Sequence, residues 1–311
     1  FAAFGALGYW IIGLFGTKPP RLLSRDDIEN EEPAINTENV AGGIDYRDGI
    51  LVDNDARFVF SFVRSAIEAG AAAANYVAMV SAVRPADKWV ATLRGVDSGE
   101  EFTTTASTIV NAAGPFVDET NEQWGLTTEH RIVYSKGIQL VVPRLTTNNH
   151  HKVLAFYDDT ERLFYVIPMG RRSVIGTTDT RVDTPFTEVD QNDIDFLLGQ
   201  INARLDLAAP LTRDDIIAER CGVRPLVVAA GKGDQKDVDW TKLSRKHAVE
   251  VDTDRGVVTI FGGKLTDCLN VGEEVAAEIE ALGVPLEKDL HNWYGEPAKA
   301  TQIGRAHVCT P

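Results

Sequence analysis

The sequence has 311 residues, of which 44% are hydrophobic and 25% are charged. This balance is typical of a folded chain with one large domain or two of modest size, and it excludes a largely disordered protein. The formal net charge of -15 excludes general binding to nucleic acid, because an acidic surface repels phosphates. Three cysteines without CxxC spacing and six histidines without an HExxH pattern predict no metal site.

The two ends of the chain differ from the rest. Residues 1–16 are apolar but fall short of the roughly 20 residues that span a bilayer, so we expect a buried helix, with contact to a membrane surface as the alternative. Ile303–Pro311 reads like a translated sequencing adapter, and we expect it to be a scar outside the fold. Both ends favour an internal piece of a longer protein.

The first half of the chain alternates between helix and strand patterns. Residues 56–70 have apolar positions at helical spacing, with Asp55 as the expected N-cap and Gly70 as the stop. Three strands joined by turns are expected over residues 73–83, 89–94 and 102–106.

A junction of strand, small residues and helix follows. Residues 107–111 form a short buried strand pattern that runs into Ala112, Ala113 and Gly114. Small residues after a buried strand allow a ligand to approach the backbone. A helix beginning near Phe116 would present its N-terminal amides to that ligand.

The second half is richer in strands, which favours a mostly antiparallel sheet. Strands are expected over residues 139–143, 152–156, 163–168, 173–177 and 216–223, with one helix over 190–205. A hairpin over 247–261 then ends in Gly262-Gly263-Lys264, and a helix over 270–282 follows. The whole pattern predicts a mixed α/β (α+β) fold.

The two glycine-containing junctions suggest one cofactor held from two sides, because a turn between a strand and a helix is where α/β proteins bind phosphates and dinucleotides. The sequence contains no GxGxxG, so the usual dinucleotide fingerprint is either absent or lies upstream of Phe1.

Two cations could bind an anionic substrate. Arg224 stands at the expected end of a strand, where a guanidinium can bind a carboxylate or a phosphate through two parallel bonds. Lys264 follows two glycines and could face the cofactor or the substrate. For both residues, an ordinary surface position is the alternative. Tyr46 and Lys136 are open between pocket lining and structural roles.

The order of these motifs resembles that of one family. Between about Gly42 and Ala281 the chain resembles the FAD-dependent glycerol-3-phosphate dehydrogenases, within the D-amino-acid oxidase-like flavoprotein superfamily. The resemblance rests on GGIDYRDG at 42–49, DAR at 55–57, VNAAGPFVD at 110–118, SKGIQLVVPR at 135–144, FYVIP at 164–168, IGTTDT at 175–180, GVRPL at 222–226, SRKH at 244–247 and FGGKLT at 261–266.

The resemblance implies an FAD-binding βαβ domain interleaved with a mostly antiparallel substrate domain. The expected division is an FAD-binding part over residues 1–130 that lacks its N-terminal fingerprint, a substrate part over 131–255, a return to the FAD-binding part over 256–302, and the scar over 303–311.

The resemblance also implies the chemistry, which is oxidation of sn-glycerol 3-phosphate to dihydroxyacetone phosphate, with hydride passing to N5 of FAD and electrons to a quinone. Arg224 and Lys264 would be catalytic, and Arg224, Tyr46 and Lys136 would bind substrate. The cofactor would contact Asn111, Ala112, Gly114, Gly262, Gly263, Lys264, Leu265 and Thr266.

The location implied by the resemblance is cytoplasmic and peripheral at the inner membrane, or at the mitochondrial inner membrane in a eukaryote; a homodimer is also expected. The chain departs from the family pattern at Asp267-Cys268-Leu269, where many relatives carry an aromatic and a basic residue. Two alternatives stay open. One is an FAD-dependent oxidase of a small amine or hydroxy acid, in which Arg224 binds a carboxylate, and the other is an inactive fragment or binding module.

Overall fold

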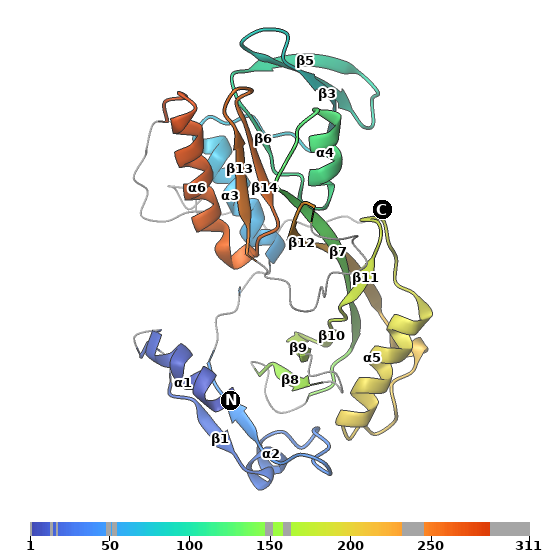
Figure 1. Ribbon diagram of the computed structural model, residues 1–311. Coiled ribbons are helices and arrows are strands. Elements are labelled where there is room, and N and C mark those ends of the chain that lie inside the picture. The colour runs from blue at the N-terminus through green and yellow to red at the C-terminus, as the bar shows by residue number, and fades with distance from the viewer. Residues whose placement is uncertain are drawn as a thin grey trace. The chain divides into compact units, whose positions relative to one another are not determined.

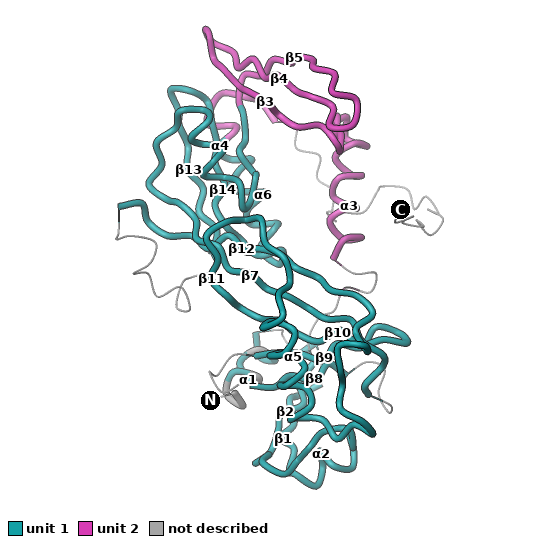
Figure 2. The backbone as a smooth tube through the Cα atoms, turned by 90° about the vertical axis from the view of Figure 1, so that its right-hand side faces the viewer, with its two compact units in different colours: residues 1–47, 109–278 teal, residues 48–108, 279–311 magenta. Residues whose placement is uncertain are grey.

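The computed structural model describes residues 2–12, 15–16, 18–47, 51, 55–146, 152–157, 163–231 and 246–286. The chain forms two compact units, one of residues 1–47 and 109–278 and one of residues 48–108 and 279–311 (Figure 2). These boundaries differ from the expected division into an FAD-binding and a substrate part, which stays a prediction. The mixed α/β fold class is confirmed.

The second unit contains the helix predicted over residues 56–70 and the three strands predicted after it. Helix α3 (Asp55–Glu68) ends before Gly70, whose φ of +94° suits glycine. Asp55 lies in the first turn of this helix instead of capping it. The three predicted strands form an antiparallel sheet in the order β3 (Val77–Val83), β4 (Trp89–Gly95) and β5 (Glu101–Ala106).

The larger sheet of the first unit is built around one long strand, β7 (His130–Pro143). All strand pairs in this sheet are antiparallel, as the sequence predicts. The other strands are β8 (Leu154–Tyr157), β9 (Leu163–Met169), β10 (Arg172–Gly176), β11 (Thr180–Val182) and β12 (Ala218–Ala229).

Helix α5 (Gln191–Arg204) covers one face of this sheet. Asp190 caps the helix by accepting a hydrogen bond from the backbone of Asp193, as expected for an acidic residue at this position. The core between helix and sheet contains Ile138, Leu140, Val142, Phe164, Ile175, Ile194, Leu197 and Ile201. These apolar side chains fix β7 and α5 against each other.

Strand β12 is longer than the sequence pattern predicts, which corrects the position of Arg224. The strand runs on through Arg224 and Pro225, so Arg224 lies in the middle of β12 and not at its end. A proline lacks the N–H that a central strand needs, which is why the pattern suggests a stop. In the described part of the chain, β12 pairs only with β7, so this missing donor is tolerated.

The smaller sheet of the first unit has the order β13 (Ala248–Asp252), β14 (Val257–Phe261) and β6 (Ile109–Asn111). The predicted hairpin joins β13 to β14, and β14 pairs with β6 in parallel. In Figure 1 this sheet lies between α6 (Cys268–Ala281) and α4 (Val117–Gln123). Each parallel strand therefore leads through a turn into a helix, as expected for the two junctions.

The N-terminal segment contains α1 (Ala2–Ile12), β1 (Arg21–Leu23), α2 (Arg25–Glu31) and β2 (Gly43–Asp45). The expectation that residues 1–16 are buried is wrong for the side chains described. Ile12 is 83% exposed, and Phe15 is 57% exposed although its ring packs edge-on against Trp10. Among the described residues, none of the helices is long and apolar enough to cross a bilayer.

Candidate functional site

The guanidinium of Arg224 is held by the loop between β10 and β11. Its Nη2 donates a hydrogen bond of 2.9 Å to Thr177 Oγ1, and its Nη1 lies 3.6 Å from Asp179 Oδ1. Asp179 also accepts a hydrogen bond from Ser135 Oγ. The side chain of Arg224 stays 32% exposed, so its charge is oriented and still accessible to solvent.

Gly137 gives the guanidinium its space. A Cβ built at Gly137 would lie 2.6 Å from Arg224 Cζ, closer than any side chain tolerates. Gly137 stands opposite Gly222 in the β7–β12 pair, and Arg224 stands opposite Ser135. The family-like segments that contain Gly137 and Arg224 therefore meet across two neighbouring strands.

Lys136 lies in a different environment from Arg224. Its side chain is 4% exposed, and its Nζ donates to Asp193 Oδ2 at 2.6 Å and to Asp190 Oδ2 at 2.8 Å. Burial alone lowers the pKa of Lys136, but the hydrogen bonds to Asp190 and Asp193 outweigh it and raise that pKa. The ammonium is therefore charged and bound within the protein.

Strand alternation separates the two cations. Successive residues of a strand point to opposite faces, so Lys136 shares the α5 face with Ile138, while Ser135 and Gly137 share the other face with Arg224. The structure does not bring Lys136 and Arg224 together. The predicted role of Lys136 in substrate binding has no support in this geometry.

Tyr46 belongs to a segment with a pocket of its own. It follows β2 and lines an open pocket of about 500 Å³ together with Lys18, Arg21 and Arg47. The pocket at the second glycine-containing turn has a separate set of lining residues. A shared role of Tyr46 and Arg224 stays a prediction.

The first junction is closed by the buried side chain of Asn111. Its Nδ2 donates to Val117 O at 3.0 Å and to Asn121 Oδ1 at 2.8 Å, and its Oδ1 accepts from the backbone of Ala113. These bonds hold the turn between β6 and α4. Ala112 is exposed at this turn, and Gly114 has a φ of +57°, so their backbone is open to a ligand.

The second junction packs against β12 at Pro225 and Val227, directly after Arg224 in the strand. Gly262 and Gly263 have φ values of +63° and +102°, and a Cβ at Gly262 would lie 3.3 Å from the carbonyl oxygen of Pro225. The turn then continues into η5 (Leu265–Asp267) and α6. Lys264 thus follows a turn that packs on the strand carrying Arg224, and a common role of the two cations stays a prediction.

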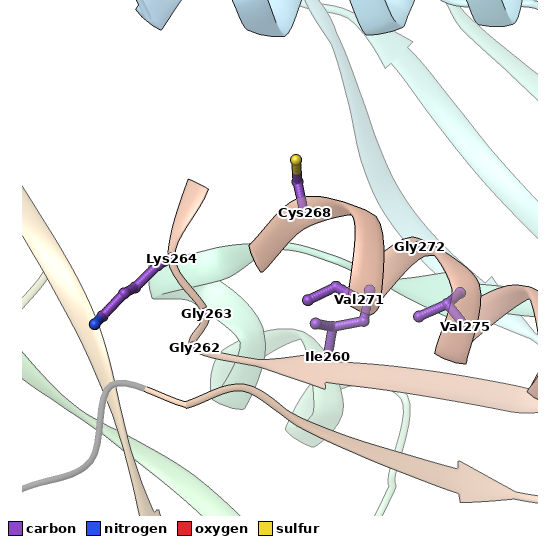
Figure 3. A pocket seen from close by; sticks show the side chains of 8 residues that line it. All are labelled: Ile260, Gly262, Gly263, Lys264, Cys268, Val271, Gly272 and Val275. Carbon is purple, nitrogen blue, oxygen red and sulfur yellow. The ribbon is translucent and has the colours of Figure 1, made fainter. Parts of the chain in front are cut away.

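A pocket of about 400 Å³ opens at this turn (Figure 3). The lining side chains of α6 and β14 are mostly apolar, while Lys264 extends away from Val271 and Ile260. Lys264, Leu265 and Thr266 are all exposed at the N-terminal end of the helix. The turn therefore combines free backbone amides, one ammonium group and an apolar wall, which together suit a large anionic ligand with an apolar ring.

His247 is a residue at this turn to which the sequence analysis gave no role. Its Nδ1 lies 2.7 Å from Asp267 Oδ2, and its Nε2 lies 2.8 Å from Glu274 Oε2. The SRKH segment contains this histidine, but its partners lie 20 and 27 residues further along the chain. The departure from the family pattern at Asp267 was the one available signal.

The family model described as FAD dependent oxidoreductase matches residues 9–284. Glycerol-3-phosphate dehydrogenase, mitochondrial, of Homo sapiens is 29% identical over 265 residues, which cover 83% of this chain and 35% of that protein. Glycerol-3-phosphate dehydrogenase 2 of Mycobacterium tuberculosis is 34% identical over 238 residues, which cover 75% of this chain and 38% of that protein.

A solved structure of a relative is also similar to this chain. The glycerol-3-phosphate dehydrogenase from Bacillus halodurans complexed with FAD matches with a TM-score of 0.69 and 27% identity, covering 85% of this chain and 50% of that one. The chain spans between 35% and 50% of the length of these relatives.

Proposed function

Because this chain belongs to the FAD dependent oxidoreductase family, we propose that it is part of an enzyme that oxidises sn-glycerol 3-phosphate to dihydroxyacetone phosphate with FAD. One observation carries the proposal. The turn Gly262–Lys264 packs against β12 at Pro225, the residue after Arg224, so a candidate cofactor turn lies on the strand that carries an oriented guanidinium. The names of the relatives supply the phosphorylated substrate.

The residues at the second junction fit FAD. Gly262 and Gly263 line the pocket, the rest of its wall is mostly apolar, and the amides at the start of α6 can stabilise negative charge. In this proposal Gly262–Thr266 holds the ring and ribityl end, and Ala112–Gly114 lies near the ribityl or pyrophosphate part. When bound, FAD supplies the hydride acceptor.

Two side chains then act on the substrate. Arg224 binds the phosphate through its fork of N–H donors, which Thr177 and Asp179 keep oriented. Lys264 would place its ammonium group near the C2 oxygen and stabilise negative charge on that oxygen. Asn111 acts indirectly, because its three hydrogen bonds fix the first turn.

The test uses the chain fused to the upstream flavin fingerprint that the resemblance implies, loaded with FAD. Anaerobic addition of sn-glycerol 3-phosphate should bleach the visible flavin absorbance. Arg224→Ala should need about tenfold to a hundredfold more substrate for the same rate, the equivalent of one charge-assisted interaction. Arg220→Ala on the same strand is the matched control.

The other outcomes separate the alternatives. A flavin that stays oxidised with sn-glycerol 3-phosphate but bleaches with an unphosphorylated amine or hydroxy acid would replace the dehydrogenase by an oxidase of the same family. A protein that binds no FAD would leave only a binding module. An Arg224→Ala variant with unchanged substrate dependence would remove Arg224 from the site.

We further propose that electrons pass to a quinone at a membrane surface. The support is α1, which exposes Leu7, Ile11 and Ile12 and is followed by the cations Lys18 and Arg21. An apolar helix next to basic residues is typical of binding to an anionic lipid surface. Faster reoxidation by a quinone analogue than by oxygen is the expected result, and the reverse order would make oxygen the acceptor.

A further inference from the structure

The ring of His247 lies between two carboxylates. Its Nδ1 faces Asp267 at 2.7 Å and its Nε2 faces Glu274 at 2.8 Å, and the side chain is only 14% exposed. An ionised carboxylate can only accept hydrogen bonds, and a neutral imidazole can donate only one. Both contacts are therefore satisfied only when His247 is an imidazolium.

The charges around His247 favour that form. The hydrogen bond to Glu274 is the largest influence that raises the pKa of His247, burial opposes it, and the hydrogen bond to Asp267 adds to it. Asp267 is itself held by Asn270 Nδ2 at 2.6 Å, and its pKa is lowered chiefly by that bond and then by His247. Lys264 is the other nearby cation that acts on Asp267.

Through the two carboxylates, His247 is bonded both to η5 and to α6. Asp267 is the last residue of η5 and follows directly on Lys264–Thr266. Glu274 lies about two helical turns later, on the flank of α6 next to the face where Cys268 and Val275 line the pocket. His247 thus fixes the helix from the side while the neighbouring face stays open.

His247 also lies close to the glycine turn Gly262–Gly263. A Cβ at Gly263 would lie 3.5 Å from the Cβ of His247, which is ordinary van der Waals distance. The side chain of His247 therefore stands next to the turn, with room for one methyl group between them, and is bonded to the helix that follows the turn. A shift of His247 would move the turn and the start of α6 together.

We propose that His247 is a positioning residue, an imidazolium bracketed by Asp267 and Glu274 that holds the turn Gly262–Thr266 in the conformation used to bind the flavin. The role of the turn rests on the proposed function, but the bracket itself does not require a cofactor. The bracket also gives a reason for a carboxylate at Asp267, in the segment 267–269 where the chain departs from the family pattern: a side chain without negative charge there could not form an ion pair with the imidazolium.

The proposal predicts a loss of order in the turn at high pH. A raised pKa means that the bracket is fully formed below the ordinary histidine pKa of about 6.5 and is lost as the pH rises through the higher pKa of the folded protein. Loss of the proton removes one of the two bonds, because the neutral ring has one donor.

The experiment is carried out on this chain without cofactor. Histidine-ring NMR should show that His247 titrates above pH 6.5, and amide hydrogen exchange, corrected for its intrinsic pH dependence, should show protection of Leu265–Glu274 falling by about tenfold or more through the same pH range. In His247→Gln and in Asp267→Asn this pH step should vanish. His130→Gln, which removes a histidine bonded to the single carboxylate of Glu250, is the matched control and should keep the step.

Three results would overturn the bracket: a His247 ring that titrates at or below pH 6.5, protection that does not change with pH, or a step that persists in His247→Gln. The same variants are then measured with FAD in the fused protein, where His247→Gln should weaken FAD binding several-fold and flatten its pH dependence. Unchanged FAD affinity in both variants would also overturn the positioning role. A pH step in a chain that never binds FAD would instead refute the proposed function and leave the bracket standing.

Discussion

Two charged clusters on the same pair of strands have different environments. On the α5 face of β7, Lys136 is enclosed by Asp190 and Asp193 and is almost completely buried. On the opposite face, Arg224 is oriented by Thr177 and Asp179 and remains one-third exposed. In the sequence, both cations stand in family-like segments that contain a glycine, Gly137 directly after Lys136 and Gly222 two residues before Arg224.

The difference teaches how to separate a structural cation from a ligand-binding one. A buried ammonium with two carboxylates has all its strong partners within the protein, and its removal leaves uncompensated charge. A guanidinium that is one-third exposed and hydrogen-bonded to a loop still presents part of its charge to solvent, where an anion can approach. Burial therefore distinguishes the two cations, although both carry the same charge.

The largest effect is expected from Lys136→Met. It leaves two carboxylates side by side, one of them the buried Asp193, and should lower the free energy of unfolding by about 3–5 kcal/mol at neutral pH. Urea unfolding measures this loss. Lys152→Met, which removes a more exposed ion pair with Glu31, is the control and should cost much less. Equal losses in the two variants would contradict the contrast drawn between buried and accessible cations.

A smaller and more local effect is expected from Gly137→Ala. The new methyl group would collide with the guanidinium of Arg224 and should raise the KM for substrate about tenfold, close to 1.4 kcal/mol of binding free energy. Gly222→Ala is the matched control, because it stands opposite Gly137 and its Cβ would have no neighbour within 4 Å. If both variants bind substrate alike, Gly137 does not serve Arg224.

The smallest effect is expected from Asp190→Asn, which keeps the helix cap but removes one charge from the Lys136 cluster. The hydrogen bond from Lys136 is the main cause that lowers the pKa of Asp190. A lowered pKa stabilises the fold above the ordinary carboxyl pKa of about 3.9 and ceases to do so as the pH falls through the folded value. The variant should therefore have a slightly lower Tm than the parent at pH 7 and no difference at more acidic pH. A difference of the same size at both pH values would show that the cap, and not the charge, was changed.

Much of the fold follows from local sequence patterns. The family resemblance is confirmed, and the helix over 56–70, the hairpin over 247–261 and the antiparallel sheet all formed, because each depends on spacing or turn residues close in the chain. Strand β12 extends further along the chain than predicted, because a proline is tolerated in a strand that has one neighbour among the described strands.

The site was less accessible to sequence reasoning. The face of Lys136 could have been read from the alternation that places Ile138, Leu140 and Val142 in the core. The partners of His247 could not, because Asp267 and Glu274 lie far along the chain and meet it only after β14 and α6 have packed. Long-range polar contacts of this kind leave no local pattern.

The parallel pairing of β6 with β14 sets an order of events during protein synthesis. Val258 pairs with Val110, about 150 residues earlier in the chain. At about 5–20 residues per second, the ribosome adds β14 roughly 7–30 s after β6. Throughout that interval the backbone N–H and C=O groups at the edge of β6 must not pair with other strands. The two candidate cofactor turns can therefore assemble only after synthesis has passed Phe261.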